Sequence, residues 1–163
     1  MKIVFHVSFW LVAGLLGGCA STEKPKGYVP TVARFFLENG NNEGIPVKLP
    51  QSGVSLMLNS KPVITEGDIV NVDLVQVDLG KCLLFHLTPA GVRDFYRLSV
   101  SHQGRRLALQ IDGIVVGARR IDGPITNGMI FVFVELPDAA LPALVDKLRM
   151  TSTEIQREIK RKE

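Results

Sequence analysis

The sequence is poor in the side chains from which catalytic and metal sites are built. It contains only two cysteines and three histidines in 163 residues. No nucleophile, base and orienting group stand in a recognisable catalytic arrangement, so we predict that the chain is not an enzyme. Cys82 and His86 fall in one predicted strand, roughly 13 Å apart, which is too far for them to share a metal ion. We therefore expect no metal, catalytic or cofactor site.

The chain also lacks a strong excess of one charge. Its formal net charge is +3, from 19 basic and 16 acidic residues, whereas a dedicated nucleic-acid binder usually has a concentrated basic face. This balance argues against nucleic acid as a partner. Beyond residue 19 no apolar run approaches the roughly 20 residues that cross a bilayer. Hydrophobic residues make up 46% of the chain, enough for one packed domain.

The first 18 residues differ from the rest. Met1-Lys2 is a short basic start, residues 3–16 are mostly apolar, and Leu16-Gly17-Gly18-Cys19 follows. This last motif resembles the lipobox of bacterial lipoproteins. The resemblance implies a signal peptide at residues 1–18, lipid attachment at Cys19, and a membrane as partner through that lipid. A transmembrane anchor, for which the apolar run is short, and an ordinary secretory signal are the alternatives.

The resemblance also implies an address. The protein would lie in the bacterial cell envelope, lipid-anchored and facing the periplasm. Ala20 after the cysteine resembles the pattern that favours the outer over the inner membrane in a Gram-negative cell. The polar residues 19–30 would be a flexible tether. With Cys19 acylated, Cys82 is a lone thiol, and its apolar neighbours predict a buried, inert position.

Residues 31–150 have the pattern of one α+β domain. Strands are predicted at residues 31–37, 47–49, 54–58, 69–79, 81–87, 106–111, 114–121 and 129–134. We expect residues 81–87 to be central and residues 129–134 to be buried, because both runs are strongly apolar. The alternation in the fourth strand slips at Leu74-Val75, where a bulge is expected. Thr65 is expected to cap a short helical turn.

Thr88 begins the central helix as an N-cap, with Pro89 in the first turn. The stripe of this helix is formed by Val92, Phe95, Tyr96 and Ser99. Asp112-Gly113 predicts a type I′ hairpin turn between two strands.

Apolar residues at helical spacing predict a second helix from about residue 141 to residue 150. Residues 151–154 resemble a capping box that would begin a charged C-terminal extension at residues 151–163, which we expect to be a frayed, solvated helix. The predicted fold is a ferredoxin-like mixed sheet with both main helices packed on one face.

Five of these segments, taken in order, resemble the periplasmic P1 head subdomain of SecD, a subunit of the bacterial protein-export machinery. They are Pro62-Val63-Ile64-Thr65-x-x-Asp68-Ile69, Phe85-His86-Leu87-Thr88-Pro89-x-Gly91, Gly104-Arg105-Arg106-Leu107-Ala108, Asp112-Gly113 and Pro124-Ile125-Thr126-Asn127-Gly128. The resemblance runs from about residue 62 to residue 150. All five are cap, turn and packing signals, so the resemblance implies a fold and a hint of protein or peptide contact. The chain departs from the family in having no transmembrane helices beyond its signal, so we expect no proton-driven transport.

A second departure from the family lies at Ala118-Arg119-Arg120, where the family has a short apolar strand reaching Ala-Pro. A two-residue turn at Asp112-Gly113 places Arg106 opposite Arg119 and Arg105 opposite Arg120. Like charges directly opposite each other cost some tenths of a kcal/mol. The arginines are therefore solvated, compensated by acids such as Asp122 and Asp94, or in contact with an anionic lipid, acidic peptide or cell-wall polymer. Arg105, Arg106, Arg119 and Arg120 are the candidate anion-contact residues.

The sequence thus predicts a membrane-anchored lipoprotein that binds proteins or peptides in the periplasm, as an accessory to protein export or envelope assembly. The alternative is a structural envelope lipoprotein that binds anionic cell-wall polymer or lipid through its arginines. An unrecognised enzyme is a third possibility. The sequence gives no oligomeric state.

Overall fold

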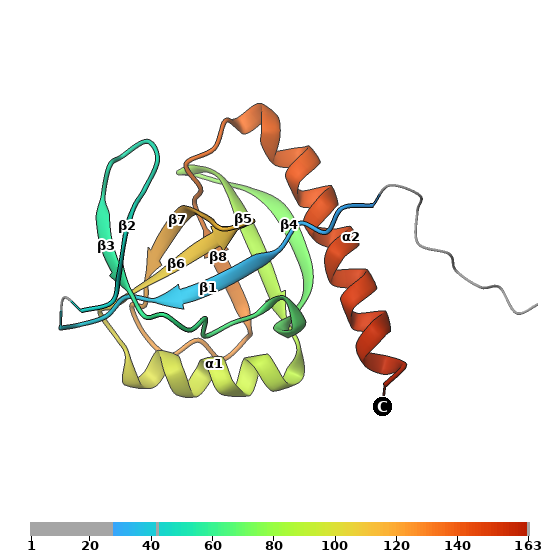
Figure 1. Ribbon diagram of the computed structural model, residues 1–163, viewed down its shortest axis with the longest axis horizontal. Coiled ribbons are helices and arrows are strands. Elements are labelled where there is room, and N and C mark those ends of the chain that lie inside the picture. The colour runs from blue at the N-terminus through green and yellow to red at the C-terminus, as the bar shows by residue number, and fades with distance from the viewer. Residues whose placement is uncertain (1–27, 42, 163) are drawn as a thin grey trace, which may run out of the picture.

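The computed structural model describes residues 28–41 and 43–162, which form two helices and eight strands. The strands are β1 (Ala33–Leu37), β2 (Ile45–Lys48), β3 (Ser55–Leu58), β4 (Ile69–Val77), β5 (Gly80–Leu87), β6 (Arg106–Ile111), β7 (Ile114–Arg120) and β8 (Met129–Val132). The helices are α1 (Pro89–Ser101) and α2 (Leu141–Lys160), with two short 3-10 turns, η1 (Glu66–Asp68) and η2 (Asp138–Ala140) (Figure 1). The predicted α+β class is confirmed. The predicted signal peptide and Cys19 lie outside the described residues.

The strands form three small antiparallel sheets, with orders β1-β6-β7, β4-β5-β8 and β2-β3. This arrangement differs from the single mixed sheet that the sequence predicts. The expected strand-helix-strand unit is present as β5-α1-β6, but its two strands belong to different sheets. A crossover between sheets creates no parallel pair, so every ladder stays antiparallel. As predicted, β5 is the central strand of its sheet.

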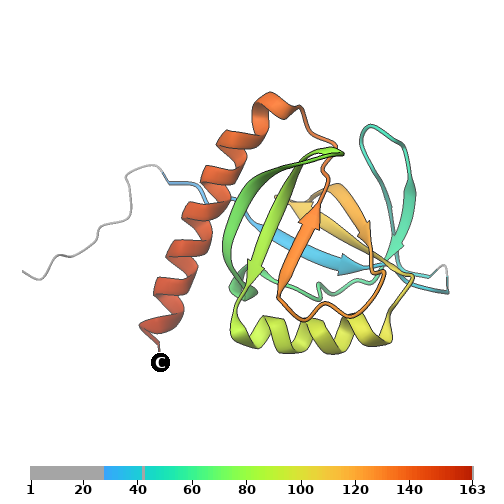
Figure 2. The same ribbon diagram turned by 180° about the vertical axis from the view of Figure 1, so that it is seen from behind.

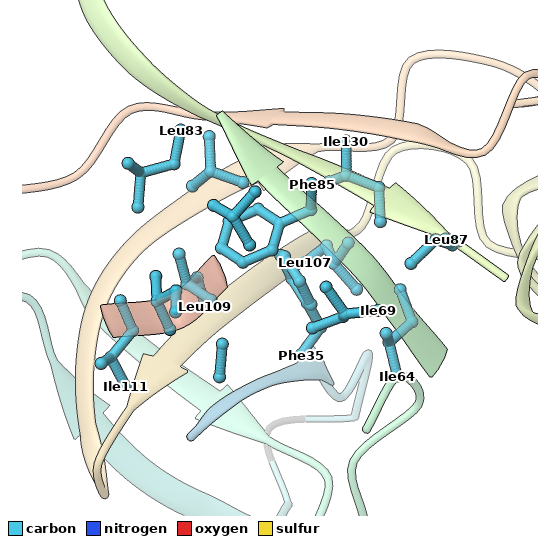
Figure 3. Packing of buried hydrophobic residues seen from close by; sticks show 14 of the residues in the cluster. Phe35, Ile64, Ile69, Leu83, Phe85, Leu87, Leu107, Leu109, Ile111 and Ile130 are labelled. Carbon is cyan, nitrogen blue, oxygen red and sulfur yellow. The ribbon is translucent and has the colours of Figure 1, made fainter. Parts of the chain in front are cut away.

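The main core lies between the β1-β6-β7 and β4-β5-β8 sheets (Figure 3). Phe35 of β1 and Phe85 of β5 meet edge to face at its centre, with ring centroids 5.0 Å apart and an interplanar angle of 86°. Both side chains are fully buried. Such aromatic pairs add about 0.5–1.5 kcal/mol to the free energy of burial, so this contact ties the two sheets together.

The β2-β3 hairpin covers the outer face of the β1-β6-β7 sheet. Leu56 and Leu58 of β3 are buried in a second cluster with Ala108 of β6 and Val115 of β7. The hairpin and α2 lie on opposite sides of the molecule in both views (Figures 1 and 2). The predicted pair of short strands is therefore confirmed, and its role is to bury the second face of a sheet.

The cap predicted for α1 is confirmed. The Thr88 hydroxyl accepts a hydrogen bond from the Gly91 N–H at 3.0 Å, and Pro89 is the first helical residue. Thr65 likewise caps η1, with Asp68 completing a capping box. The apolar stripe predicted for α1 is confirmed only in part, because the side chain of Tyr96 is 43% exposed.

The two helices do not share one face of a sheet. Figures 1 and 2 show α1 across one end of the two larger sheets, while α2 runs along the side next to β4. Two side chains of α2 explain its position: Arg149 donates from Nε to the Val72 carbonyl at 3.1 Å, and Gln156 donates to the Ile69 carbonyl at 3.3 Å. These bonds cover backbone groups of β4, an edge strand that would otherwise be open to other chains.

Helix α2 is longer than predicted, because it continues without a break from Leu141 to Lys160. The predicted capping box at residues 151–154 is wrong. The Thr151 hydroxyl donates to the Lys147 carbonyl at 2.9 Å, one turn earlier in the same helix, and accepts from the Thr31 N–H at 3.0 Å. Thr151 and Ser152 are buried, so this part of the charged extension is a packed helix and not a frayed one.

Local backbone geometry confirms one predicted turn and moves one predicted bulge. Asp112 and Gly113 both have positive φ, 47° and 87°, as a type I′ hairpin requires. In β4 the register slips between Ile69 and Asn71, and the bulge expected at Leu74-Val75 is absent from that ladder. At this shift in register the Val70 side chain is exposed to solvent.

Candidate functional site

The four predicted arginines lie at the end of the β6-β7 hairpin that is farther from its turn. Arg106 pairs with Arg120 and Leu107 pairs with Arg119, so the predicted facing of Arg106 with Arg119 is wrong by one residue. The cause is an extra residue, Val116, which leaves the ladder between two paired positions of β7. Gly117 follows it and lies so close to the Phe133 carbonyl that a Cβ would collide with that oxygen. The close approach of residues 132–134 therefore accompanies the bulge that shifts the arginines.

Arg106 is used inside the fold. Its backbone N–H and its Nε donate to Glu38 Oε2 at 3.1 and 2.9 Å, and its Nη2 bonds the other carboxylate oxygen. The hydrogen bonds from Arg106 lower the pKa of Glu38, and the charge of Arg105 adds to the effect. Arg106 therefore joins the end of β1 to the start of β6.

The other arginines have different surroundings. Arg105 lies with its guanidinium against Gly40, in the loop after β1. Arg120 is 3.9 Å from Asp122, one of the two acids expected to compensate the cluster. The second expected acid, Asp94, instead lies 3.8 Å from Arg97 on α1.

Arg119 is the half-buried exception. Its guanidinium makes only long hydrogen bonds to carbonyls, to Arg120 O at 3.4 Å and Phe131 O at 3.5 Å. It has no ion pair with any acid among residues 28–41 and 43–162. Burial lowers the pKa of Arg119, against a weaker attraction from Asp122. The structure thus separates the predicted cluster into three arginines with neighbours of their own and one poorly compensated cation beside β8.

An exposed apolar surface lies next to Arg119. Phe131 and Phe133 are 37% and 42% exposed, although the sequence predicts a buried strand at residues 129–134. The prediction fails because only one side of β8, with Ile130 and Val132, faces the core. Phe131 on the other side of β8, and Phe133 directly after the strand, are exposed to solvent.

These two rings border a shallow depression of about 310 Å³ on the outside of the β4-β5-β8 sheet. Its lining comes from the end of β4, the β4-β5 turn, β5, β8 and the residue directly after β8: Val77, Asp78, Leu79, Cys82, Phe131 and Phe133. Cys82 is 1% exposed, as predicted, and burial raises the pKa of its thiol. Such a thiol is a poor nucleophile, so the depression is an apolar surface rather than a reactive one.

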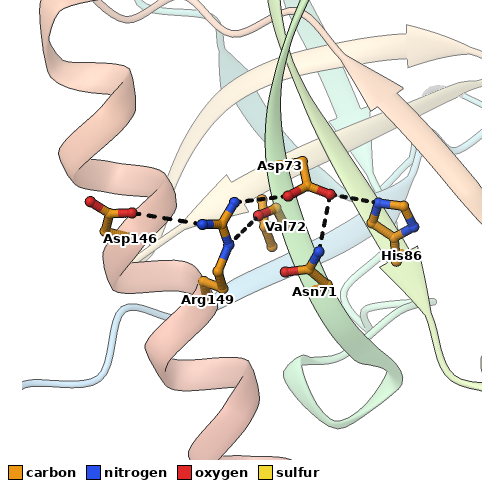
Figure 4. Close-up of polar contacts among 6 residues, drawn as sticks. All are labelled: Asn71, Val72, Asp73, His86, Asp146 and Arg149. Carbon is orange, nitrogen blue, oxygen red and sulfur yellow. Dashed lines mark hydrogen bonds and ion pairs between the residues drawn. The ribbon is translucent and has the colours of Figure 1, made fainter.

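A polar network occupies the other end of the same sheet face (Figure 4). Asp73 on β4 bonds His86 Nε2 at 2.9 Å, Arg149 Nη2 at 2.8 Å and Asn71 Nδ2 at 3.0 Å. Burial alone would raise the pKa of Asp73, but these hydrogen bonds outweigh it and lower the pKa. Arg149 comes from α2, so the network fastens that helix to the sheet. Sequence reasoning missed it, because residue types alone do not bring Asp73 and Arg149 together.

A groove of about 790 Å³ lies between the first turn of α1 and the last turns of α2. Two of its polar side chains are already used within the fold: Thr88 caps α1, and Gln156 donates to the Gly67 and Ile69 carbonyls. Among the described residues no three His, Cys, Asp or Glu side chains come together in a way that suits a metal ion. The same residues include no helix that is both long and apolar enough to cross a bilayer.

No protein-family model matches the sequence, and no curated protein matches it. Similar folds occur in crystal structures of SecDF. The structure of SecDF in its super-membrane-facing form has a TM-score of 0.58 and 20% sequence identity over 74% of this chain. A second structure has the same three values and belongs to SecDF described as a membrane component that enhances protein export.

A third structure, SecDF from Thermus thermophilus, is described as a translocon-associated membrane protein. It has a TM-score of 0.50 and 20% identity over 76% of this chain. The chain spans only 19%, 63% and 20% of the three SecDF chains, in the order given. The likeness is therefore one of fold, to the periplasmic region of SecDF, and it agrees with the resemblance noted in the sequence.

Proposed function

We propose that this chain is a non-catalytic, lipid-anchored envelope protein whose SecD head-like domain binds proteins or peptides in the periplasm, as an accessory to protein export or envelope assembly. The observation that carries the proposal is the fold shared with SecDF over about three quarters of the chain. One of those proteins is described as enhancing protein export. The exposed rings of Phe131 and Phe133 add an apolar surface of the kind that protein partners cover.

The anchor in this proposal is Cys19, in the motif Leu16-Gly17-Gly18-Cys19. Diacylation adds about 0.8 kcal/mol for each buried methylene, and two acyl chains give stable anchoring where one does not. The outer membrane is favoured over the inner membrane for a Gram-negative source, because Ala20 follows the cysteine.

A structural envelope protein is the second candidate function. It would bind anionic cell-wall polymer or lipid through the arginine end of the β6-β7 hairpin. Arg119 supports it, because this cation forms no ion pair in the described part of the chain and is attracted only weakly by Asp122. Salt separates the two functions, since arginine-driven anion binding weakens as ionic strength rises and apolar peptide binding does not.

Chemical crosslinking of the full chain in intact cells, followed by mass spectrometry, tests the proposal. Subunits of the export machinery or newly secreted chains are the expected products. Recovery of only cell-wall or lipid material would contradict protein binding and support the structural alternative. The Cys19→Ser variant is the control for anchoring, because it should leave the membrane fraction.

A further inference from the structure

The outer face of β8 carries apolar side chains with the spacing of an extended peptide. Phe131 and Phe133 are two residues apart and border the same depression, so they point to one side of the sheet. Alternate residues of an extended chain are about 6.6 Å apart, which is also the spacing between side chains on one face of a bound peptide. The depression, about 310 Å³, is at the small end of ligand pockets, which span about 300–1,000 Å³. It suits one or two side chains rather than a whole small molecule.

Charge next to the depression narrows the class of partner. The Arg119 guanidinium bonds the Phe131 carbonyl at a long 3.5 Å, and no described carboxylate pairs with it. Lys81, near the start of β5, forms an ion pair with Asp138 at 3.5 Å. Among the described residues that line the depression, Asp78 in the β4-β5 turn is the one with a charged side chain. Arginine binds carboxylates by two parallel hydrogen bonds, and Arg119 has the donors for this.

We propose that the outer face of β8, together with Phe133 directly after the strand, binds an extended peptide segment in which an apolar side chain is followed two residues later by an acidic residue. The apolar side chain fills the depression between Phe131 and Phe133, and the carboxylate pairs with Arg119. This inference rests on the proposed function and names the surface and the class of partner for it. Aromatic anchors and an arginine are the residues that most often carry the binding energy of an interface.

Two labelled peptides test the inference with the full chain held in nanodiscs. Both alternate phenylalanine with serine and differ only in the residue two positions after the last phenylalanine, which is Asp in one and Asn in the other, so that this residue faces the same side as the phenylalanines. Fluorescence anisotropy should give a dissociation constant about tenfold lower for the Asp peptide, the size expected for one charge-assisted hydrogen-bonded pair. Equal affinities, or no binding of either peptide, would overturn the inference without any protein variant.

Variants then assign the effect to residues. Arg119→Gln should remove the preference for the Asp peptide, Arg119→Lys should keep part of it, and Phe133→Ser should weaken both peptides alike. Ile114→Ser removes a more exposed apolar side chain from the hairpin tip and should change neither affinity, and Arg97→Gln is the control for an exposed arginine. A preference that survives in Arg119→Gln would overturn the assignment. So would Arg119-dependent binding to phosphatidylglycerol vesicles without any preference between the peptides.

Photo-crosslinking in cells distinguishes failure of this inference from failure of the proposed function. A photoreactive residue at Phe133 should capture partners that one at Tyr96, on α1, does not. Capture of export proteins from Tyr96 alone would overturn the β8 surface and leave the function standing. No protein captured from either position would contradict both.

Discussion

The pairing of Glu38 with Arg106 makes a prediction that bears on which arginines are free to bind anions. Glu38→Gln keeps the shape of the side chain and removes its charge. In the folded protein the carboxylate accepts from the Arg106 backbone N–H and from its guanidinium. The Glu38 side chain is only 19% exposed, while that of Arg106 is 40% exposed.

The magnitude follows from this partial burial. Hydrogen bonds to charged groups contribute about 1.5–3 kcal/mol, and fully exposed ion pairs about 0–1 kcal/mol. Because the arginine is more than a third exposed, we expect Glu38→Gln to lower the free energy of unfolding by about 1–2 kcal/mol near neutral pH. In a domain of this size that corresponds to a fall in Tm of about 3–8 °C.

The effect also has a pH dependence of known sign. The pKa of Glu38 is lowered in the folded state, mainly by its hydrogen bonds to Arg106. A group with a lowered folded pKa stabilises the protein above its unfolded pKa, about 4.3 for glutamate, and loses that contribution as the pH falls through the folded pKa. The difference in free energy of unfolding between the wild type and Glu38→Gln should therefore be largest near pH 7 and disappear in acid.

Urea unfolding at several pH values, followed by circular dichroism, measures this difference. Asp94→Asn is the matched control, because Asp94 and Arg97 form an exposed pair with side chains 75% and 80% accessible. That variant should change the free energy of unfolding by less than about 0.5 kcal/mol. If Glu38→Gln costs no more than Asp94→Asn, or if its cost is unchanged in acid, the charge of Glu38 does not stabilise the fold through Arg106.

Three further predictions follow from the packing. In urea unfolding Gly117→Ala should lower the stability of the fold by about 2 kcal/mol or more, because its Cβ would collide with the Phe133 carbonyl. Gly123→Ala is the control and should be near neutral, because nothing lies within 4 Å of a Cβ there. Equal effects of the two substitutions would contradict the close approach at Gly117. Gln156→Ala should speed amide hydrogen exchange in β4 relative to β5, because it removes side-chain bonds to carbonyls near the start of β4, and unchanged protection would count against this role of α2. Cys82 should react with a thiol reagent only after unfolding, because it is buried and its pKa is raised, and fast reaction in the native protein would be inconsistent with its position.

Features set by a few neighbouring residues could be predicted from the sequence. The cap at Thr88 and the turn at Asp112-Gly113 each depend on residues within one turn, and both are confirmed. The predicted cap at Thr151 fails for a tertiary reason. A threonine hydroxyl can bond a carbonyl one turn earlier as well as cap a helix, and contact with Thr31, 120 residues away, holds Thr151 inside α2.

The candidate site was less predictable because its decisive contacts are distant in sequence. Arg106 finds Glu38 at a separation of 68 residues, and the bulge at Val116 shifts Arg119 and Arg120 by one position along β6. The sequence predicts a buried strand at residues 129–134, but Phe131 and Phe133 are exposed. Whether the outer side of a strand is covered depends on what packs against that face of the sheet, and the pattern of the strand itself carries no signal for this.

The proposed function requires this chain to contact other proteins during export. Site-specific photo-crosslinking of the full chain in cells, during a short pulse of radiolabelled amino acid, tests that contact. Labelled, newly secreted chains or export subunits should be captured from a photoreactive residue at position 133, and capture should fall when secretion is blocked. Capture that gives no labelled protein, or the same products with secretion blocked, would contradict a role in export and leave the likeness to SecDF as one of fold alone.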